Sequence, residues 1–155
     1  AFFCYDSAFL KGCVTSVNNE ILKKIIENQN WNNTNLPSYL SKDNIQNLLY
    51  KVIDINHQED ANALGNQVIN SIGNNHQGIF FPIAEDLIDI LVIILNNSQN
   101  NHKRKLLILG ILNDLYYFDL DAKSKEDLNL INKYESIKSK LSNFSDENFQ
   151  NFLKN

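Results

Sequence analysis

The sequence contains few residues that interrupt regular structure, with only 5 Gly and 2 Pro among 155 residues. A β-sandwich or barrel needs many tight turns, and Gly and Pro form most of them. Their scarcity therefore argues against a multi-stranded β fold. Hydrophobic residues make up 43% of the chain, which is enough apolar surface to offset the chain entropy lost on folding. We expect one folded domain over residues 1–155.

Cysteine is also scarce, since Cys4 and Cys13 are the only two in the chain. Two cysteines cannot form a disulfide framework. We expect free, buried thiols in a cytoplasmic protein, with a single local disulfide as the alternative. The apolar N-terminus lacks a basic segment and meets Asp6 at once, so we do not expect an intact signal peptide, although a cleaved one could have preceded it. The absence of Met leads us to expect a trimmed start.

Long apolar runs and the usual catalytic motifs are missing too. No run approaches the ~20 residues of a membrane helix, and the longest, Leu87 to Leu95, is interrupted by Asp89. The three histidines, His57, His76 and His102, are scattered, and there is no HExxH, CxxC, GxGxxG or Walker pattern. We therefore expect no cofactor, no metal site and no enzymatic activity.

The net charge of −4 is distributed unevenly. Residues 1–57 carry five basic and five acidic groups, residues 58–122 carry three and eight, and residues 123–155 carry six and five. An acidic middle third argues against nucleic-acid binding, which needs a basic surface. It is compatible with an acidic face that meets a basic partner.

Apolar residues recur with helical spacing after the first dozen residues. The pattern predicts an all-α fold of six or seven helices, with Ser41 capping the second and Gly73 or Asn74 ending the third in a left-handed conformation. Short connections favour antiparallel HEAT-like pairs, in an open solenoid or a compact bundle. The predicted helices cover residues 17–26, 43–53, 59–72, a segment opened by Pro82, 102–117, 125–141 opened by Ser124 in an approximate capping box with Asp127, and a short segment after Ser145.

A turn of unusual composition, Asn75 to Pro82, joins the third and fourth predicted helices. Gly78 can adopt a positive φ angle without a Cβ clash. His76 and Gln77 can bond to polar groups left open at the two helix ends. The following residues, Phe80 and Phe81, are expected to anchor the corner in the core.

This His-Gln-Gly turn, with a proline three residues later that opens a Leu-rich helix, resembles the core of HEAT-like bacterial immunity proteins. The resemblance runs from Leu36 to Tyr117 and includes Leu36-Pro37, the segment from Leu87 to Leu91, and Arg104 before Leu106 to Leu112. Family members usually have Thr after the glycine and Tyr before the proline, where this chain has Ile79 and Phe81. The resemblance implies a protein that binds and neutralises a toxin delivered between neighbouring cells, as in contact-dependent growth inhibition.

Two acidic groups are predicted to contact such a partner. At helical spacing, Glu85, Asp86 and Asp89 gather at the start of the fourth helix. A solvated N-terminal turn, favoured by the helix dipole, is the stronger interpretation there. A second cluster ends the fifth helix, where negative charge opposes the dipole and tyrosines are typical of binding hot spots. It contains Asp114, Tyr116, Tyr117, Asp119 and Asp121. The alternative is that one tyrosine packs inward and the acids belong to an ordinary loop.

The sequence thus predicts a monomeric or 1:1 immunity protein that covers the basic active-site cleft of a cognate toxin domain. A nuclease, either an RNase or a DNase, fits best because nucleases present basic clefts. The alternative is a helical adaptor or scaffold protein in an endogenous complex. Neither interpretation involves a membrane or direct contact with nucleic acid.

Overall fold

A computed structural model describes residues 18–31 and 40–144 of the chain. Predictions that fall on residues 1–17, 32–39 and 145–155 lie outside this part. They include those for Cys4 and Cys13, the Leu36-Pro37 segment and the short helix after Ser145.

Helices dominate the described residues, which confirms the predicted fold class. Five of the six predicted helices here begin and end within a few residues of the observed bounds, and residues 102–117 match them fully. The α-helices are α2 (Asn19–Glu27), α3 (Lys42–Ile53), α4 (Ala61–Ile72), α5 (Ala84–Asn96), α6 (His102–Tyr117) and α7 (Leu128–Leu141), and two short 3₁₀-helices are η1 (Ser124–Glu126) and η2 (Ser142–Phe144).

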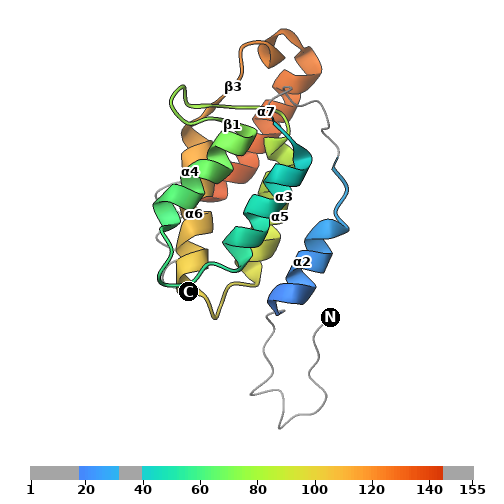
Figure 1. The fold of residues 1–155 in the computed structure, drawn as a ribbon. Coiled ribbons are helices and arrows are strands. Elements are labelled where there is room, and N and C mark those ends of the chain that lie inside the picture. The colour runs from blue at the N-terminus through green and yellow to red at the C-terminus, as the bar shows by residue number, and fades with distance from the viewer. Residues whose placement is uncertain (1–17, 32–39, 145–155) are drawn as a thin grey trace.

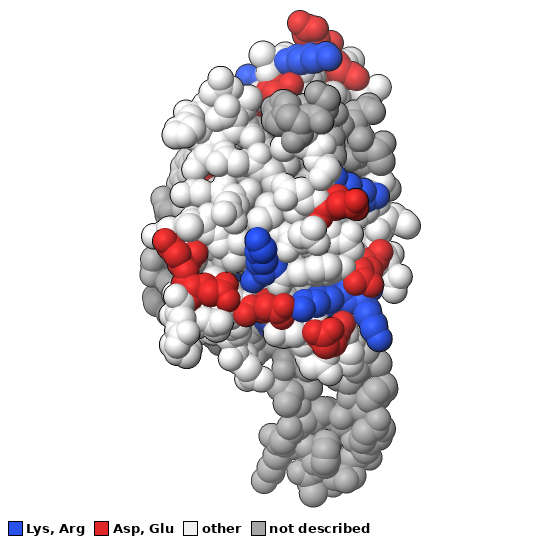
Figure 2. Space-filling view, viewed as in Figure 1, with Lys and Arg blue, Asp and Glu red and all other residues white. Residues whose placement is uncertain are grey.

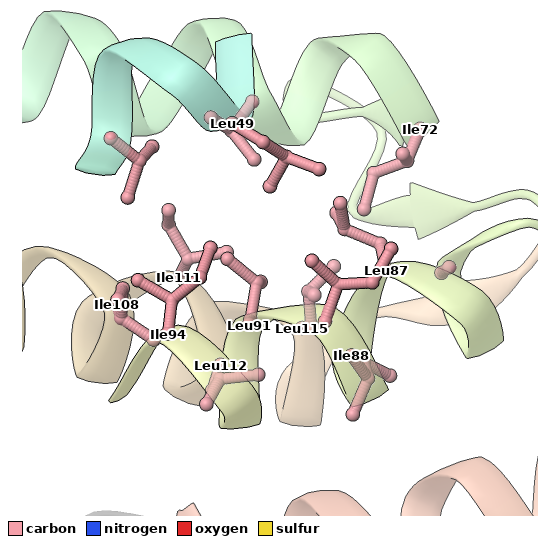
Figure 3. Close-up of a cluster of buried hydrophobic side chains, with 14 of the residues drawn as sticks. Leu49, Ile72, Leu87, Ile88, Leu91, Ile94, Ile108, Ile111, Leu112 and Leu115 are labelled. Carbon is pink, nitrogen blue, oxygen red and sulfur yellow. The ribbon is translucent and has the colours of Figure 1, made fainter. Parts of the chain in front are cut away.

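The central helices form two antiparallel pairs, α3 with α4 and α5 with α6 (Figure 1). The two pairs meet where α4 packs along α6, and these two helices run in the same direction (Figure 1). The core lies between the pairs (Figure 3). There Leu49 of α3 and Ile72 of α4 face the leucines and isoleucines of α5 and α6, all almost fully buried. Burial of each such side chain contributes ~1.5–3 kcal/mol.

Side-chain caps fix where most of these helices begin. Ser41 Oγ accepts a hydrogen bond from the Asn44 N–H at 3.1 Å, as predicted, and Asp60 caps α4 in the same way. The prediction for α7 was wrong by three residues. Asp127 caps the helix, whereas Ser124 lies in η1 and its hydroxyl donates to Asp121.

A small three-stranded sheet, absent from the sequence prediction, joins the ends of α4 and α6. Strand β1 (Gly73–Asn74) pairs antiparallel with β2 (Ile79–Phe80), and β2 pairs parallel with β3 (Asp119–Leu120). The prediction that Gly73 or Asn74 ends α4 in a left-handed conformation was therefore wrong. Gly73 is extended, with φ −173°, and a Cβ there would lie 2.2 Å from the Ile79 carbonyl oxygen. Glycine is required here because strand β2 lies too close for a Cβ, and not because of the φ angle.

The turn between β1 and β2 has the predicted left-handed glycine. Gly78 has φ 62°, the only positive φ angle among the described residues. The backbone N–H groups of His76 and Gln77 both donate to Asn74 Oδ1, while the two side chains are exposed. Phe80 is fully buried, and its ring stacks on Tyr134 with centroids 5.9 Å apart. Pro82 lies in the turn before α5, which begins two residues later.

Arg104 is the one basic side chain in the buried core of the described residues, and it is 4% exposed. Its guanidinium donates to the carbonyl oxygens of Ile53 (2.9 Å) and Asn97, which lie at the ends of α3 and α5. It also donates to Ser98 Oγ at 2.7 Å and to Asn19 Oδ1 at 3.1 Å. One side chain of α6 therefore joins three other helices, α2, α3 and α5.

A second contact layer holds α2 at this junction. Asn19 Nδ2 donates to Asp54 Oδ1 at 3.2 Å, and Lys23 Nζ lies 2.5 Å from Asp54 Oδ2. Asp54 raises the pKa of Lys23 by hydrogen bonding to its ammonium group. Burial lowers the pKa of Arg104, and the charge of Asp54 opposes that shift. The carboxylate of Asp54 thus compensates both cations.

We predict that Arg104→Met will destabilise the protein by about 3 kcal/mol, because it leaves several buried acceptors without a donor. Urea unfolding followed by circular dichroism measures the change. Lys51→Met on the exposed side of α3 is the matched control and should change stability by less than about 0.5 kcal/mol. Equal stability of the two variants would contradict a central role for the guanidinium.

Candidate partner-binding surface

The acidic residues of α5 that were predicted to contact a partner interact mainly with other residues of this protein. Glu85 lies 3.6 Å from Lys133, and Asp89 lies 3.1 Å from Lys140, so both ion pairs join α5 to α7. Asp86 is only 6% exposed and is out of reach of a partner. Glu85 and Asp89 therefore join α7 to α5, and Asp86 is buried, so the three side chains do not form an open acidic surface.

The predicted cluster after α6 is likewise built into the fold. Asp119 pairs with Lys125, and hydrogen bonding to that lysine is the main cause that lowers the pKa of Asp119. Asp121 accepts hydrogen bonds from the N–H and hydroxyl groups of Ser124, which shapes the turn into η1.

Lys138 of α7 occupies the aromatic part of the same cluster. Its Nζ lies 4.8 Å from the centroid of the Tyr116 ring and 5.8 Å from that of Tyr134. It also donates to the Phe118 carbonyl oxygen at 3.1 Å. Burial lowers the pKa of Lys138, although Asp119 opposes the shift. A cation of the chain itself thus balances much of the negative charge here.

A different set of residues lies open on α6. Leu106, Gly110, Asp114 and Tyr117 are spaced so that they share one side of the helix, and we call them the α6 row. Leu106 is 37% exposed and Tyr117 is 61% exposed. Among the described residues only Leu128 joins them as an exposed large hydrophobic side chain. Tyr117 also packs edge-on against Tyr116, with centroids 5.0 Å apart.

The α6 row borders a groove between α4 and α6, with a volume of about 110 Å³. Two glycines keep it open. A Cβ on Gly65 would meet Leu107 Cδ1 at 3.2 Å, whereas a Cβ on Gly110 would meet nothing within 4 Å. The groove is lined by Ala61, Asn62, Gly65, Asn66, Ile69, Leu106, Leu107, Gly110, Ile111 and Asp114.

Asp114 is the one charged residue that lines this groove. Burial by its neighbours raises the pKa of its carboxyl group, although the side chain stays accessible from solvent. No described residue donates a hydrogen bond to it or forms an ion pair with it. The adjacent helix α4 contains no Asp, Glu, Lys or Arg at all.

The surface around α4 shares this lack of charge. In the view of Figure 2, charged side chains gather in the lower part and at the top of the molecule, while the area over α4 and β1 between them is mostly uncharged. Across residues 18–31 and 40–144, no group of three or more His, Cys, Asp or Glu side chains is placed to hold a metal ion. No described helix is both long and apolar enough to cross a membrane.

Sequence reasoning selected Asp114 and Tyr117 but missed Leu106, Gly65 and Gly110. The missed signal was Gly110, a glycine inside a helix and in the middle of an apolar run, where glycine is unfavourable. Comparison with protein-family models, with curated proteins and with solved structures finds no match to this chain.

We predict that Gly110→Ala will stabilise the protein by about 0.5–1 kcal/mol, because alanine favours the helix and its Cβ meets open space. Gly65→Ala is the matched control, since its Cβ would press on Leu107. It should stabilise less or destabilise. Thermal and urea unfolding of both variants test this, and a loss of stability in Gly110→Ala would mean that the groove is closed in solution.

We also predict that Asp114→Asn will stabilise the protein at pH 7. A raised pKa means that folding favours the neutral carboxyl, so the carboxylate weakens the fold at pH values above that pKa. The gain should vanish towards pH 3, where the acid is protonated in both states.

Asp119→Asn is the control, and it should lower the stability at pH 7 where Asp114→Asn raises it. Because Lys125 lowers the pKa of Asp119, its carboxylate stabilises the fold at pH 7, and this contribution is lost as the pH falls through the folded-state pKa. Urea unfolding at pH 7 and pH 3 measures both. The same sign for both variants at pH 7 would rule out desolvation as the main influence on Asp114.

Proposed function

We propose that the protein binds another protein through the α6 row, and that this partner is a bacterial toxin domain which it neutralises. The observation that carries the proposal is the composition of the row. Two of the three exposed large apolar side chains of the described residues, Leu106 and Tyr117, lie on either side of an accessible carboxylate, Asp114. Exposed aromatic and aliphatic side chains around a few polar groups are typical of protein interfaces.

The charge distribution supports a basic partner. Residues 58–122 contain three basic groups against eight acidic ones, and Arg104, one of the three, is buried. Asp86, one of the eight, is buried as well, so the surface of this segment keeps the acidic excess of its composition. A toxin with a basic cleft, of which a nuclease is the best fit, would be attracted to it and lose access to its substrate once covered.

The choice of a toxin as the partner rests on the resemblance to HEAT-like immunity proteins. The His-Gln-Gly turn on which that resemblance depends has the expected left-handed glycine. An adaptor protein of an endogenous complex would show the same exposed row. The two functions differ in what they do to a cell, and this difference is testable.

If the protein is an immunity protein, its toxin should be encoded by the neighbouring upstream gene. The test is to express the product of that gene, alone and together with this protein, and to follow cell growth. An immunity protein should restore growth and bind the purified toxin domain at a 1:1 ratio in calorimetry. No rescue and no binding would refute the proposed function.

We predict that Tyr117→Ala will weaken binding to that toxin domain by about 2 kcal/mol, as expected for a central aromatic contact. Leu128→Ala is the matched control, because Leu128 is 71% exposed but lies outside the α6 row. Calorimetry measures both affinities. If Leu128→Ala weakens binding and Tyr117→Ala does not, the contact surface lies near α7.

A further inference from the structure

The α4–α6 groove combines apolar walls with a single charge. Leu106, Leu107 and Ile111 of α6 face Ala61 and Ile69 of α4 across it, and Asp114 lies at one end. The groove lies between two helices that run in the same direction (Figure 1). Its polar lining is limited to Asp114, Asn62 and Asn66.

We propose that this groove receives the side chain of one arginine of the partner protein, with the guanidinium on Asp114 and the methylenes along the apolar walls. The inference rests on the proposed function, because it names the group by which the partner would be held. The occupant is chosen by charge complementarity. An acidic group alone in an apolar groove selects a cation that carries an apolar stem, and long basic side chains have this construction.

Arginine fits the polar atoms of the groove better than lysine. Its planar guanidinium has five N–H donors and can bind a carboxylate with two parallel hydrogen bonds. The Asn62 side chain offers an amide oxygen in the same lining. Asn66 Oδ1 already accepts a hydrogen bond from Asn75 at 3.0 Å, so it has one lone pair left for a further donor.

The chain does not supply this cation from its described residues. Three basic residues lie at the start of α6, and none of them lines the groove. Lys103 donates to the carbonyl oxygen of Glu59 and ties α6 to the loop before α4. Arg104 is committed to the helix junction. Farther along the chain, Lys125 pairs with Asp119, and Lys138 lies over the ring of Tyr116. Asp114 thus differs from Asp89, Glu85 and Asp119, which all have lysine partners.

Gly110 provides an independent reason to treat the groove as a binding site. It has no positive φ angle, and a Cβ there would meet nothing within 4 Å. The fold therefore does not require glycine at this position. What glycine does provide is an open groove wall beside Asp114, since Gly110 and Asp114 are one helical turn apart.

The experiment uses the full chain and two blocked peptides, acetyl-Gly-Arg-Gly-amide and the same peptide with citrulline in place of arginine. Citrulline keeps the shape and loses the charge. Titration is followed by ¹H–¹⁵N NMR. The arginine peptide should shift the signals of Gly65, Gly110 and the Asn62 side chain, and the citrulline peptide should bind about tenfold more weakly or not at all.

Three variants locate the binding site. Asp114→Asn should weaken the arginine peptide about tenfold or more. Gly110→Leu should abolish its effect by filling the groove, with an unchanged circular dichroism spectrum as the check on folding. Asp89→Asn, which removes an exposed carboxylate elsewhere, should leave the affinity unchanged.

The proposal is overturned if the arginine peptide shifts no groove signal, if citrulline binds equally well, or if Asp89→Asn weakens binding as much as Asp114→Asn does. Because no toxin takes part in the titration, its result is separate from that of the growth test. Growth rescue without peptide binding would refute the groove and leave the proposed function standing. Peptide binding without growth rescue would support the groove as an arginine site and refute the proposed function.

Discussion

The guanidinium of Arg104 joins the ends of helices that would otherwise leave polar groups buried. The last carbonyl groups of a helix have no N–H partner within the helix and carry partial negative charge. The ends of α3 and α5 meet beside the start of α6, and Arg104 donates to a carbonyl oxygen from each. A neutral side chain could satisfy one of these acceptors, but a planar cation with five donors can satisfy several at once.

Anchoring of α6 in this way determines which residues reach the surface. With Arg104 turned into the helix junction, the inner side of α6 is the stripe from Ile108 through Ile111 and Leu112 to Leu115 (Figure 3). The α6 row must then face outwards beside α4. The same geometry hides one of the few basic charges of the middle third. Lysines of α7 balance Glu85 and Asp89 of α5, whereas Asp114 has no partner among the described residues.

The sequence predicted what depends on local pattern. The helices follow from apolar spacing, the start of α3 from Ser41, and the Gly78 turn from the one residue type that accepts a positive φ angle. It missed what depends on distant contacts. Two-residue strands are too short to show a periodic pattern, so the sequence gives no sign of the sheet. The role of Gly73 was predicted wrongly because glycine is required there by the close approach of the Ile79 backbone in the neighbouring strand. Asp119 and Asp121 were grouped with Asp114 as neighbours in sequence, yet Lys125 and Ser124 hold them in place.

Three locally unfavourable features lie on one side of one helix. Glycine inside a helix weakens it, exposed Leu and Tyr side chains leave apolar surface in water, and a partly desolvated carboxylate resists ionisation. Each would be removed by a single substitution that the fold has room for, most clearly Gly110→Ala. Locally unfavourable residues that gather in one place, as these do, are typical of functional sites. A cationic, partly apolar side chain in the groove would reverse the second and third of these costs together, because it covers Leu106 and stabilises the charge of Asp114 by the same contact.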